Sequence, residues 1–113
     1  MTNKMLQFVD IGQQNPPKRD KSQRKEDFGE IYQEFIHDRA KEQSSRCSQC
    51  GVPFCQVHCP LSNNIPDWLK LTAEGRYEEA YHLSQSTNNM PEVCGRICPQ
   101  DRLCEGNCVI EQS

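Results

Sequence analysis

Eight cysteines in two groups are the residues of this chain whose type and spacing could do chemistry. The groups read Cys47-x2-Cys50-x4-Cys55-x3-Cys59-Pro60 and Cys94-x3-Cys98-Pro99-x4-Cys104-x3-Cys108. A [4Fe–4S] cluster is held by four cysteine thiolates, and the bacterial ferredoxin run is Cys-x2-Cys-x2-Cys-x3-Cys-Pro. The first group has this form with its middle gap widened. The spacing therefore predicts two [4Fe–4S] clusters and a role in electron transfer.

The order of ligands follows from the ferredoxin rule that the last cysteine of a run serves the other cluster of a pair. By that rule Cys59 crosses to the second cluster and Cys108 returns to the first. The first cluster is then held by Cys47, Cys50, Cys55 and Cys108, and the second by Cys59, Cys94, Cys98 and Cys104. This hypothesis from spacing ties the two halves of the chain together.

Zinc is the alternative metal, because two four-cysteine zinc sites need the same eight thiolates. Cys47-x2-Cys50 is a common zinc half-site, but it is the single Cys-x2-Cys pair in the chain. The two Cys-Pro steps, at Cys59 and Cys98, also favour iron–sulfur. A zinc module that only mediates subunit contacts remains the rival interpretation.

Composition limits the function classes. The 113 residues carry a net charge of −3, which gives no general attraction to nucleic acid. The N-terminus lacks the apolar region of a secretory signal, and no stretch is long enough to span a membrane. We therefore expect a cytoplasmic protein, in a reducing compartment where clustered cysteines bind metal or do redox chemistry rather than form disulfides.

The elements that must position the cysteines are predicted to be helices, so the fold class is all-α, with no period-two strand pattern. An amphipathic pattern predicts a helix from Lys25 to about Ser45. Asn64 as N-cap, Pro66 in the first turn and Gly75 as terminator predict a second helix, and residues 76–86 a third, forming a hairpin. A short helix starts at Pro91 and stops at Pro99.

The domain organisation predicted from this pattern is an extended N-terminal arm at residues 1–24 and a helical two-cluster domain at residues 25–113. The arm is expected to have little fixed structure of its own and contains Pro16-Pro17.

A basic run from Lys18 to Lys25 is interpreted either as a solvated linker or as a docking strip for an acidic partner. Three arginines beside the cysteines could offset cluster charge or be ordinary surface residues: Arg46, Arg96 and Arg102.

Three longer segments make the chain recognisable. They are Arg46-Cys-Ser-Gln-Cys-Gly-Val-Pro-Phe-Cys55, Cys59-Pro-Leu-Ser-Asn-Asn-Ile-Pro-Asp-Trp68 and Pro91-Glu-Val-Cys-Gly-Arg-Ile-Cys-Pro-Gln-Asp-Arg-Leu-Cys-Glu-Gly-Asn-Cys108. They closely resemble the N-terminal part of the small (beta) subunit of NADPH-dependent glutamate synthase. The same domain type is similar to the N-terminal region of dihydropyrimidine dehydrogenase and of related flavin oxidoreductases.

The resemblance implies an alpha-helical ferredoxin-like domain with two [4Fe–4S] clusters and no catalytic residue of its own. In such enzymes NADPH reduces FAD on the small subunit, and electrons pass through these clusters toward the large subunit. There, glutamate is formed from 2-oxoglutarate and glutamine. The resemblance carries over Cys94 less directly than the other ligands, because some relatives complete that site with a residue further downstream.

No Gly-x-Gly-x-x-Gly dinucleotide motif occurs in these 113 residues. The sequence therefore predicts that the FAD and NADPH sites lie on further or partner domains. The chain by itself would be the electron relay of an oxidoreductase. The expected partners are those flavin and NADPH domains and the glutamate synthase large subunit, or the corresponding parts of a related flavin oxidoreductase.

Overall fold

The computed structural model describes residues 5–34 and 37–110, and the regular elements within these residues are helices. The only pairing of extended segments within them is one antiparallel bridge between Lys18 and Tyr32. The predicted all-α class is confirmed. The elements in chain order are η1 (Gln7–Val9), α1 (Lys21–Arg24), α2 (His37–Ser44), α3 (Phe54–His58), α4 (Ile65–Ala73), α5 (Tyr77–Gln85), α6 (Pro91–Ile97) and η2 (Glu105–Asn107).

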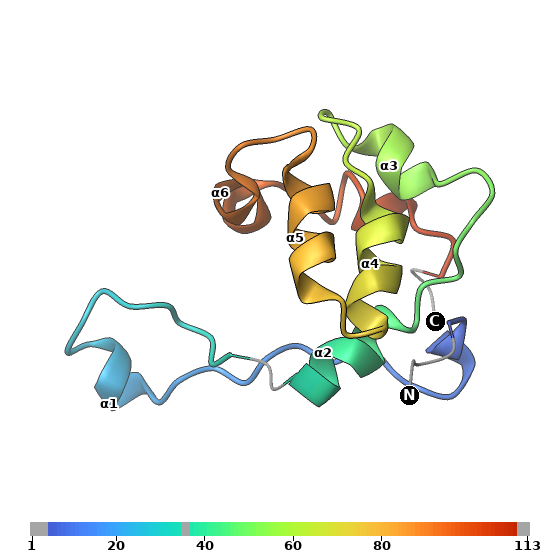
Figure 1. The fold of residues 1–113 in the computed structure, drawn as a ribbon. Coiled ribbons are helices and arrows are strands. Elements are labelled where there is room, and N and C mark those ends of the chain that lie inside the picture. Colours follow the sequence, from blue (N-terminus) through green and yellow to red (C-terminus); the bar gives the residue numbers. More distant parts are fainter. Residues whose placement is uncertain (1–4, 35–36, 111–113) are drawn as a thin grey trace.

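The helical hairpin α4–α5 is the centre of the fold, and α2 packs against α4 (Figure 1). Pro66 stands in the first turn of α4, as predicted. Gly75 ends the helix with φ +82°, and its N–H and that of Arg76 bond back to Thr72 and Leu71 at 3.0 and 2.8 Å. These two bonds form a Schellman motif, which needs a left-handed residue that glycine supplies without strain.

The segment between Cys59 and α4 is held to the end of α5 by a polar network. Asn63 donates to the Ser84 carbonyl at 2.8 Å and to the Thr87 hydroxyl at 3.0 Å, and it accepts the Trp68 indole N–H at 2.7 Å. Asn64 occupies the predicted N-cap position, but its side chain donates to Ser86 instead of capping the helix. This network fixes the path of the chain that leaves Cys59.

The helix predicted from Lys25 to about Ser45 is wrong in its first half. Of the described residues in that range, only His37–Ser44 are helical. Residues 35 and 36, on which part of the predicted apolar face falls, lie outside the described residues. Phe28 is fully exposed, so the amphipathic face around it has no surface to pack on. Because packing supplies most of a short helix's stability, the periodic pattern alone does not form the helix.

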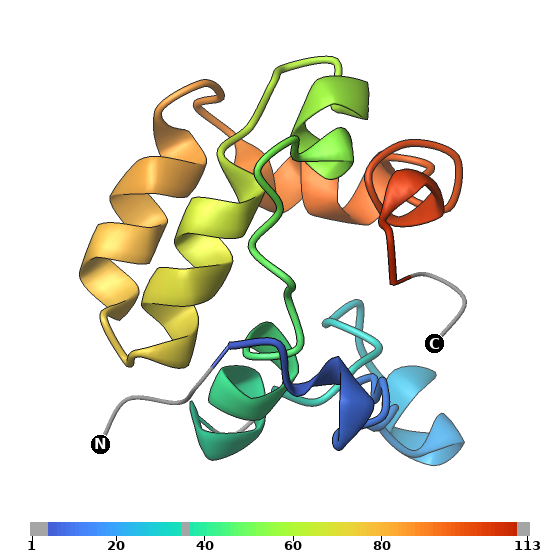
Figure 2. The same cartoon turned by 90° about the vertical axis from the view of Figure 1, so that its right-hand side faces the viewer.

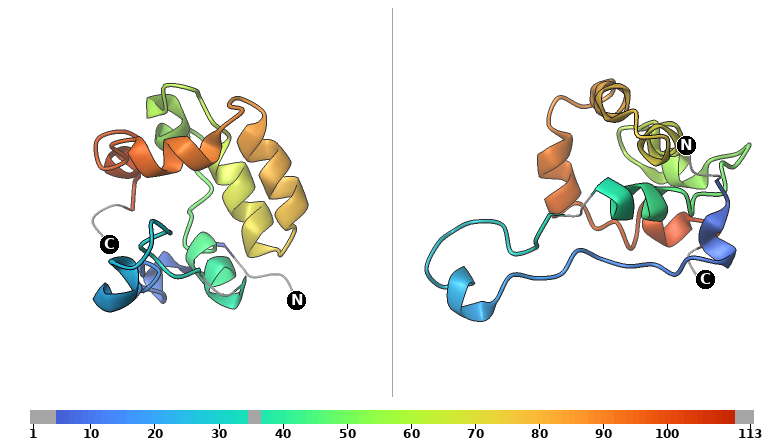
Figure 3. Two further views of the ribbon diagram at one scale, coloured as in Figure 1. Left: turned by 90° about the vertical axis from the view of Figure 1, so that its left-hand side faces the viewer. Right: turned by 60° about the horizontal axis from the view of Figure 1, so that its bottom comes forward.

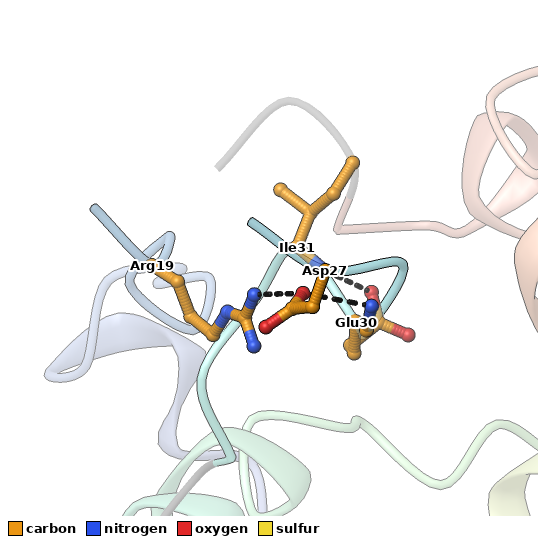
Figure 4. Close-up of polar contacts among 5 residues, drawn as sticks. Arg19, Asp27, Glu30 and Ile31 are labelled. Carbon is orange, nitrogen blue, oxygen red and sulfur yellow. Dashed lines mark hydrogen bonds and ion pairs between the residues drawn. The ribbon is translucent and has the colours of Figure 1, made fainter. Parts of the chain in front are cut away.

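Local polar contacts hold residues 16–34, here called the lobe, in a different conformation. The Asp27 carboxylate accepts bonds from Arg19, at 2.7 Å, and from the Gly29 N–H (Figure 4). The hydrogen bond from Arg19 lowers the pKa of Asp27. Glu30 pairs with Arg96 of α6. The lobe projects from the rest of the molecule with α1 near its tip (Figure 3).

The charge of the lobe is balanced. Residues 18–34 hold five basic and five acidic side chains. An acidic partner would therefore meet no net positive charge here, and the contacts favour the solvated-linker interpretation of the basic run over the docking-strip interpretation.

The N-terminal segment lies along the residues that lead into Cys47. Leu6 donates its N–H to the Cys47 carbonyl at 3.1 Å, and Gln7 donates to the Ser45 carbonyl at 2.9 Å. Arg46 is 9% exposed and donates to the Ile11 carbonyl at 2.8 Å. The segment also closes the turn of η1 on itself, because Asp10 and Ile11 donate their N–H groups to the Gln7 carbonyl at 3.0 and 2.8 Å. The division of the chain at residue 24 stays a prediction.

Candidate iron–sulfur site

All eight cysteines are free and half-buried. Their positions follow a pattern, since most of them stand at or beside the ends of short helices. Cys55 lies on α3 and Cys94 on α6, while Cys59 and Cys98 directly follow these two helices. Cys104 and Cys108 flank η2, and Cys47 and Cys50 lie in the loop between α2 and α3.

The fold brings the two cysteine groups to one side of the molecule. Helix α3 contacts η2, although more than 40 residues separate them in the chain. In Figure 2 the turn around η2 and α6 lie on the same side of the hairpin as α3. The segment carrying Cys104 and Cys108 therefore lies next to the one carrying Cys55 and Cys59.

The electrostatics of Cys55 identify its neighbours. The pKa of the Cys55 thiol is raised to about 11, mainly by burial, and the negative charges of Cys47, Cys108 and Cys104 contribute to this rise. A hydrogen bond from the Gln56 N–H opposes this rise. Cys55 is thus within electrostatic range of Cys108, which is distant in sequence, as well as of Cys47.

Cys98 and Cys104 have a different set of neighbours. Burial raises the pKa of Cys98, followed by the charges of Cys94 and Cys59. Burial also raises the pKa of Cys104, and the charges of Glu105 and Cys59 add to the effect. Since only the thiolate binds metal, these raised pKa values mean that metal binding must release protons.

Three side chains that the sequence analysis did not single out hydrogen-bond to cysteine sulfurs. Gln49 donates to Cys47 at 3.3 Å, Asn88 donates to Cys94 at 3.0 Å, and Ser48 bonds to Cys50 at 3.0 Å. Gln49 and Ser48 could have been noticed, because they are polar residues inside the Cys-x2-Cys segment. Nothing in the sequence marks Asn88 as a partner of a cysteine, because it lies outside both cysteine groups and only the turn between α5 and α6 brings it to Cys94.

The arginines beside the cysteines make mainly structural contacts. Arg46 bonds to Ile11, as described above, and so holds the N-terminal segment. Arg96 donates to the Glu30 carboxylate at 2.7 Å and to the Glu92 carbonyl at 2.9 Å. His58 is exposed, and its Nδ1 lies 2.9 Å from the Phe54 carbonyl oxygen. These partners favour the structural interpretation of Arg46 and Arg96 over a role in offsetting cluster charge.

Comparison with known proteins decides the family. A family model described as dihydropyrimidine dehydrogenase domain II, 4Fe-4S cluster, matches residues 24–113. The chain belongs to this 4Fe-4S domain family. Within the described residues, no helix has the length and apolar character needed to cross a membrane.

Individual relatives of this 4Fe-4S domain are parts of longer proteins. The chain is 72% identical to the glutamate synthase [NADPH] small chain of Azospirillum brasilense and 52% identical to that of Escherichia coli, each over 97% of its own length. It is 50% identical, over 77% of its length, to the putative oxidoreductase AegA of Escherichia coli. The chain spans 23% of the length of the two glutamate synthase small chains.

The donor set fits the cofactor of the 4Fe-4S family. Eight free, half-buried cysteines are soft anionic ligands once deprotonated, and they suffice for two clusters of four ligands each. Among residues 5–34 and 37–110, no three His, Cys, Asp or Glu side chains converge as ligands of one metal ion. In a [4Fe–4S] cluster each cysteine binds a different iron atom, so its ligands surround the cluster and need not meet at one point.

The turn that carries Cys104 and Cys108 in this 4Fe-4S domain depends on Gly106. The Gln100 carbonyl accepts the N–H groups of Glu105 at 2.9 Å and Gly106 at 3.1 Å. A Cβ atom added at Gly106 would lie 2.0 Å from the Asp101 carbonyl oxygen. The backbone on both sides is hydrogen-bonded, so a side chain at this position can be accommodated only by opening the turn.

Gly106→Ala is therefore expected to lower the free energy of unfolding by about 3 kcal/mol and to loosen both flanking cysteines. The free energy is measured by urea unfolding of the iron–sulfur protein, and iron retention is followed in the same samples. Gly12→Ala is the control, because a Cβ atom there meets nothing within 4 Å. Equal unfolding midpoints for the two variants would contradict the predicted clash.

Proposed function

We propose that this chain is the electron-transfer domain of a glutamate synthase small subunit and carries two [4Fe–4S] clusters. The first is assigned to Cys47, Cys50, Cys55 and Cys108, and the second to Cys59, Cys94, Cys98 and Cys104. When bound, the clusters supply one-electron redox chemistry, and the chain's own residues hold them, shield them and hydrogen-bond their sulfur ligands.

The observation that carries the two-cluster assignment is the grouping of cysteines that are distant in sequence. Cys55 has Cys47 and Cys108 among its charged neighbours, whereas Cys98 has Cys94 and Cys59. These neighbours support the crossed order of ligands that the spacing predicts. The charge of Cys59 raises the pKa of Cys104, and the charge of Cys104 raises the pKa of Cys55. Both effects are expected if the ligands of the two proposed clusters lie beside one another.

The enzyme is proposed from the relatives, because 97% of the chain aligns with glutamate synthase [NADPH] small chains. In this proposal NADPH reduces FAD on domains outside residues 1–113. Electrons then cross the two clusters toward the large subunit, where glutamate is formed from 2-oxoglutarate and glutamine. The chain is the relay between these centres and carries no catalytic residue.

Metal and sulfide analysis tests the cofactor. Protein purified without oxygen is expected to be brown, to hold about eight iron and eight sulfide atoms per chain, and to bleach with dithionite. Zinc is assayed in the same sample. About two zinc atoms without sulfide, in protein that also resists iron–sulfur reconstitution, would replace this proposal with a structural zinc module.

Co-purification tests the choice of enzyme. The loaded small subunit is expected to associate with a large subunit, and the complex is expected to form glutamate from 2-oxoglutarate and glutamine with NADPH. A complex that holds the clusters but makes no glutamate would assign the domain to another flavin oxidoreductase.

A further inference from the structure

Gln49 stands between two proposed ligands of the first cluster, Cys47 and Cys50, in an unusual backbone conformation. Its φ is +52°, in the left-handed region of backbone conformation that residues other than glycine rarely adopt. A residue held there is retained by contacts that outweigh the local strain, and such positions are concentrated at binding sites. The backbone conformation of Gln49 therefore marks it as a candidate functional residue.

Both nitrogen atoms of Gln49 point to one sulfur. The backbone N–H donates to Cys47 Sγ at 3.5 Å, and side-chain Nε2 donates to the same atom at 3.3 Å. One residue thus supplies two donors to one proposed ligand of the cluster.

The side-chain amide is also anchored on the helical hairpin. Gln49 Nε2 donates to the Pro66 carbonyl oxygen at 2.8 Å, and Pro66 is buried in the first turn of α4. The amide is therefore held between a rigid helix and the sulfur. Its position does not depend on the cluster, so the donor is already oriented when the cluster binds.

A donor fixed at a cysteine sulfur affects the two redox states of a cluster unequally. Reduction by one electron adds one negative charge, which is shared by the irons, the sulfides and the cysteine sulfurs. N–H groups aimed at a sulfur stabilise the more negative state, and such bonds are one of the factors that set cluster potentials. Removing a donor should therefore make the cluster harder to reduce.

We propose that Gln49 is a positioning residue that raises the reduction potential of the cluster at Cys47 by donating two N–H groups to its sulfur. The proposal rests on the proposed function, since it needs a cluster at Cys47. It adds a residue to the electron relay that is not itself a ligand, and it predicts which of the two clusters responds to a change at this position.

The test is a redox titration of the anaerobically purified, iron–sulfur-loaded protein, followed by electron paramagnetic resonance. Gln49→Met keeps the length of the side chain and removes its donor. At a fixed potential near the wild-type midpoint, the ratio of reduced to oxidised cluster is expected to fall about tenfold, equivalent to about 59 mV for a one-electron couple. Only one of the two clusters should shift.

The matched control is Gln56→Met on the neighbouring helix α3. The Gln56 amide donates to the Ser62 carbonyl at 3.4 Å and to Asn64 Oδ1 at 3.2 Å, with no bond to sulfur. Its replacement should leave both midpoint potentials unchanged. A second variant, Gln49→Glu, keeps the shape of the side chain, replaces the donor by a negative charge and should lower the potential at least as much as Gln49→Met.

The outcomes separate this inference from the proposed function. Protein without iron and sulfide refutes the function itself, and this is known before any titration. Fully loaded Gln49→Met with a wild-type potential overturns the role of Gln49. Loss of the first cluster from both Gln49 variants, but not from Gln56→Met, also overturns it, because Gln49 would then hold the loop rather than tune the cluster.

Discussion

Replacing Cys108 with alanine is expected to remove the first of the two proposed clusters and to leave the second in place. Cys108 lies after η2, near the end of the chain, yet Cys55 of α3 has it as a charged neighbour. A cubane that loses one of its four thiolates is poorly held. The iron content should therefore fall from about eight to about four atoms per chain.

The control for this experiment is Cys59→Ala, because Cys59 lies only four residues after Cys55. If position along the chain decided the ligand sets, Cys59→Ala would affect the same cluster as a change at Cys55. The crossed order predicts the opposite, since Cys59 is a charged neighbour of Cys98 and Cys104. Cys59→Ala should therefore remove the second cluster and spare the first.

Electron paramagnetic resonance of the reduced variants identifies which cluster remains. The two variants should each keep one signal, and the signals should differ. Loss of the second cluster alone from Cys108→Ala would refute the crossed order and would assign each cluster to one contiguous cysteine group.

Removing both clusters with a chelator is expected to abolish cooperative unfolding of the cysteine-bearing part of the chain. Helices α3, α6 and η2 contain no buried residue. The buried apolar side chains among the described residues are Pro66, Ala73 and Ala80, and all three belong to the hairpin. With so little apolar burial, the free energy of metal binding supplies most of the folding free energy there.

Amide hydrogen exchange before and after chelation measures this effect. Protection in α3, α6 and η2 should fall to the level of an unfolded chain. The α4–α5 hairpin is an internal reference, and fluorescence of Trp68, the only tryptophan, reports on it directly. Unchanged protection in α3 and α6 after complete iron loss would show that the polypeptide supports these helices without the clusters.

The local residues of the hairpin carry enough information to predict it. Pro66 is suited to a first helical turn and Gly75 to a left-handed terminator, and neither requirement depends on distant parts of the chain. The same is true of the short helix between Pro91 and Pro99, because proline limits helices at both ends. The cysteine spacing likewise indicates the cofactor class, since close ligands on one loop reflect local geometry.

The region around Phe28 shows where this reasoning fails. Its three- and four-residue apolar spacing predicts a helix, but a helix forms only when that face finds a surface to cover. Instead, the Asp27 carboxylate accepts hydrogen bonds from the Gly29 N–H and the Arg19 guanidinium, and Phe28 is left fully exposed. Hydrogen bonds available within a few residues outweigh a periodic pattern that has no packing partner.

The sequence by itself determined the cofactor class, the all-α architecture and the hairpin, because these follow from ligand chemistry and from residues that act over a few positions. Only the tertiary structure decided which distant groups meet. It brings η2 against α3, so that Cys108 neighbours Cys55, and it places Gln49 between Cys47 and the Pro66 carbonyl. Such contacts depend on how helices pack, and that packing energy is summed over the whole fold and is not encoded in any one motif.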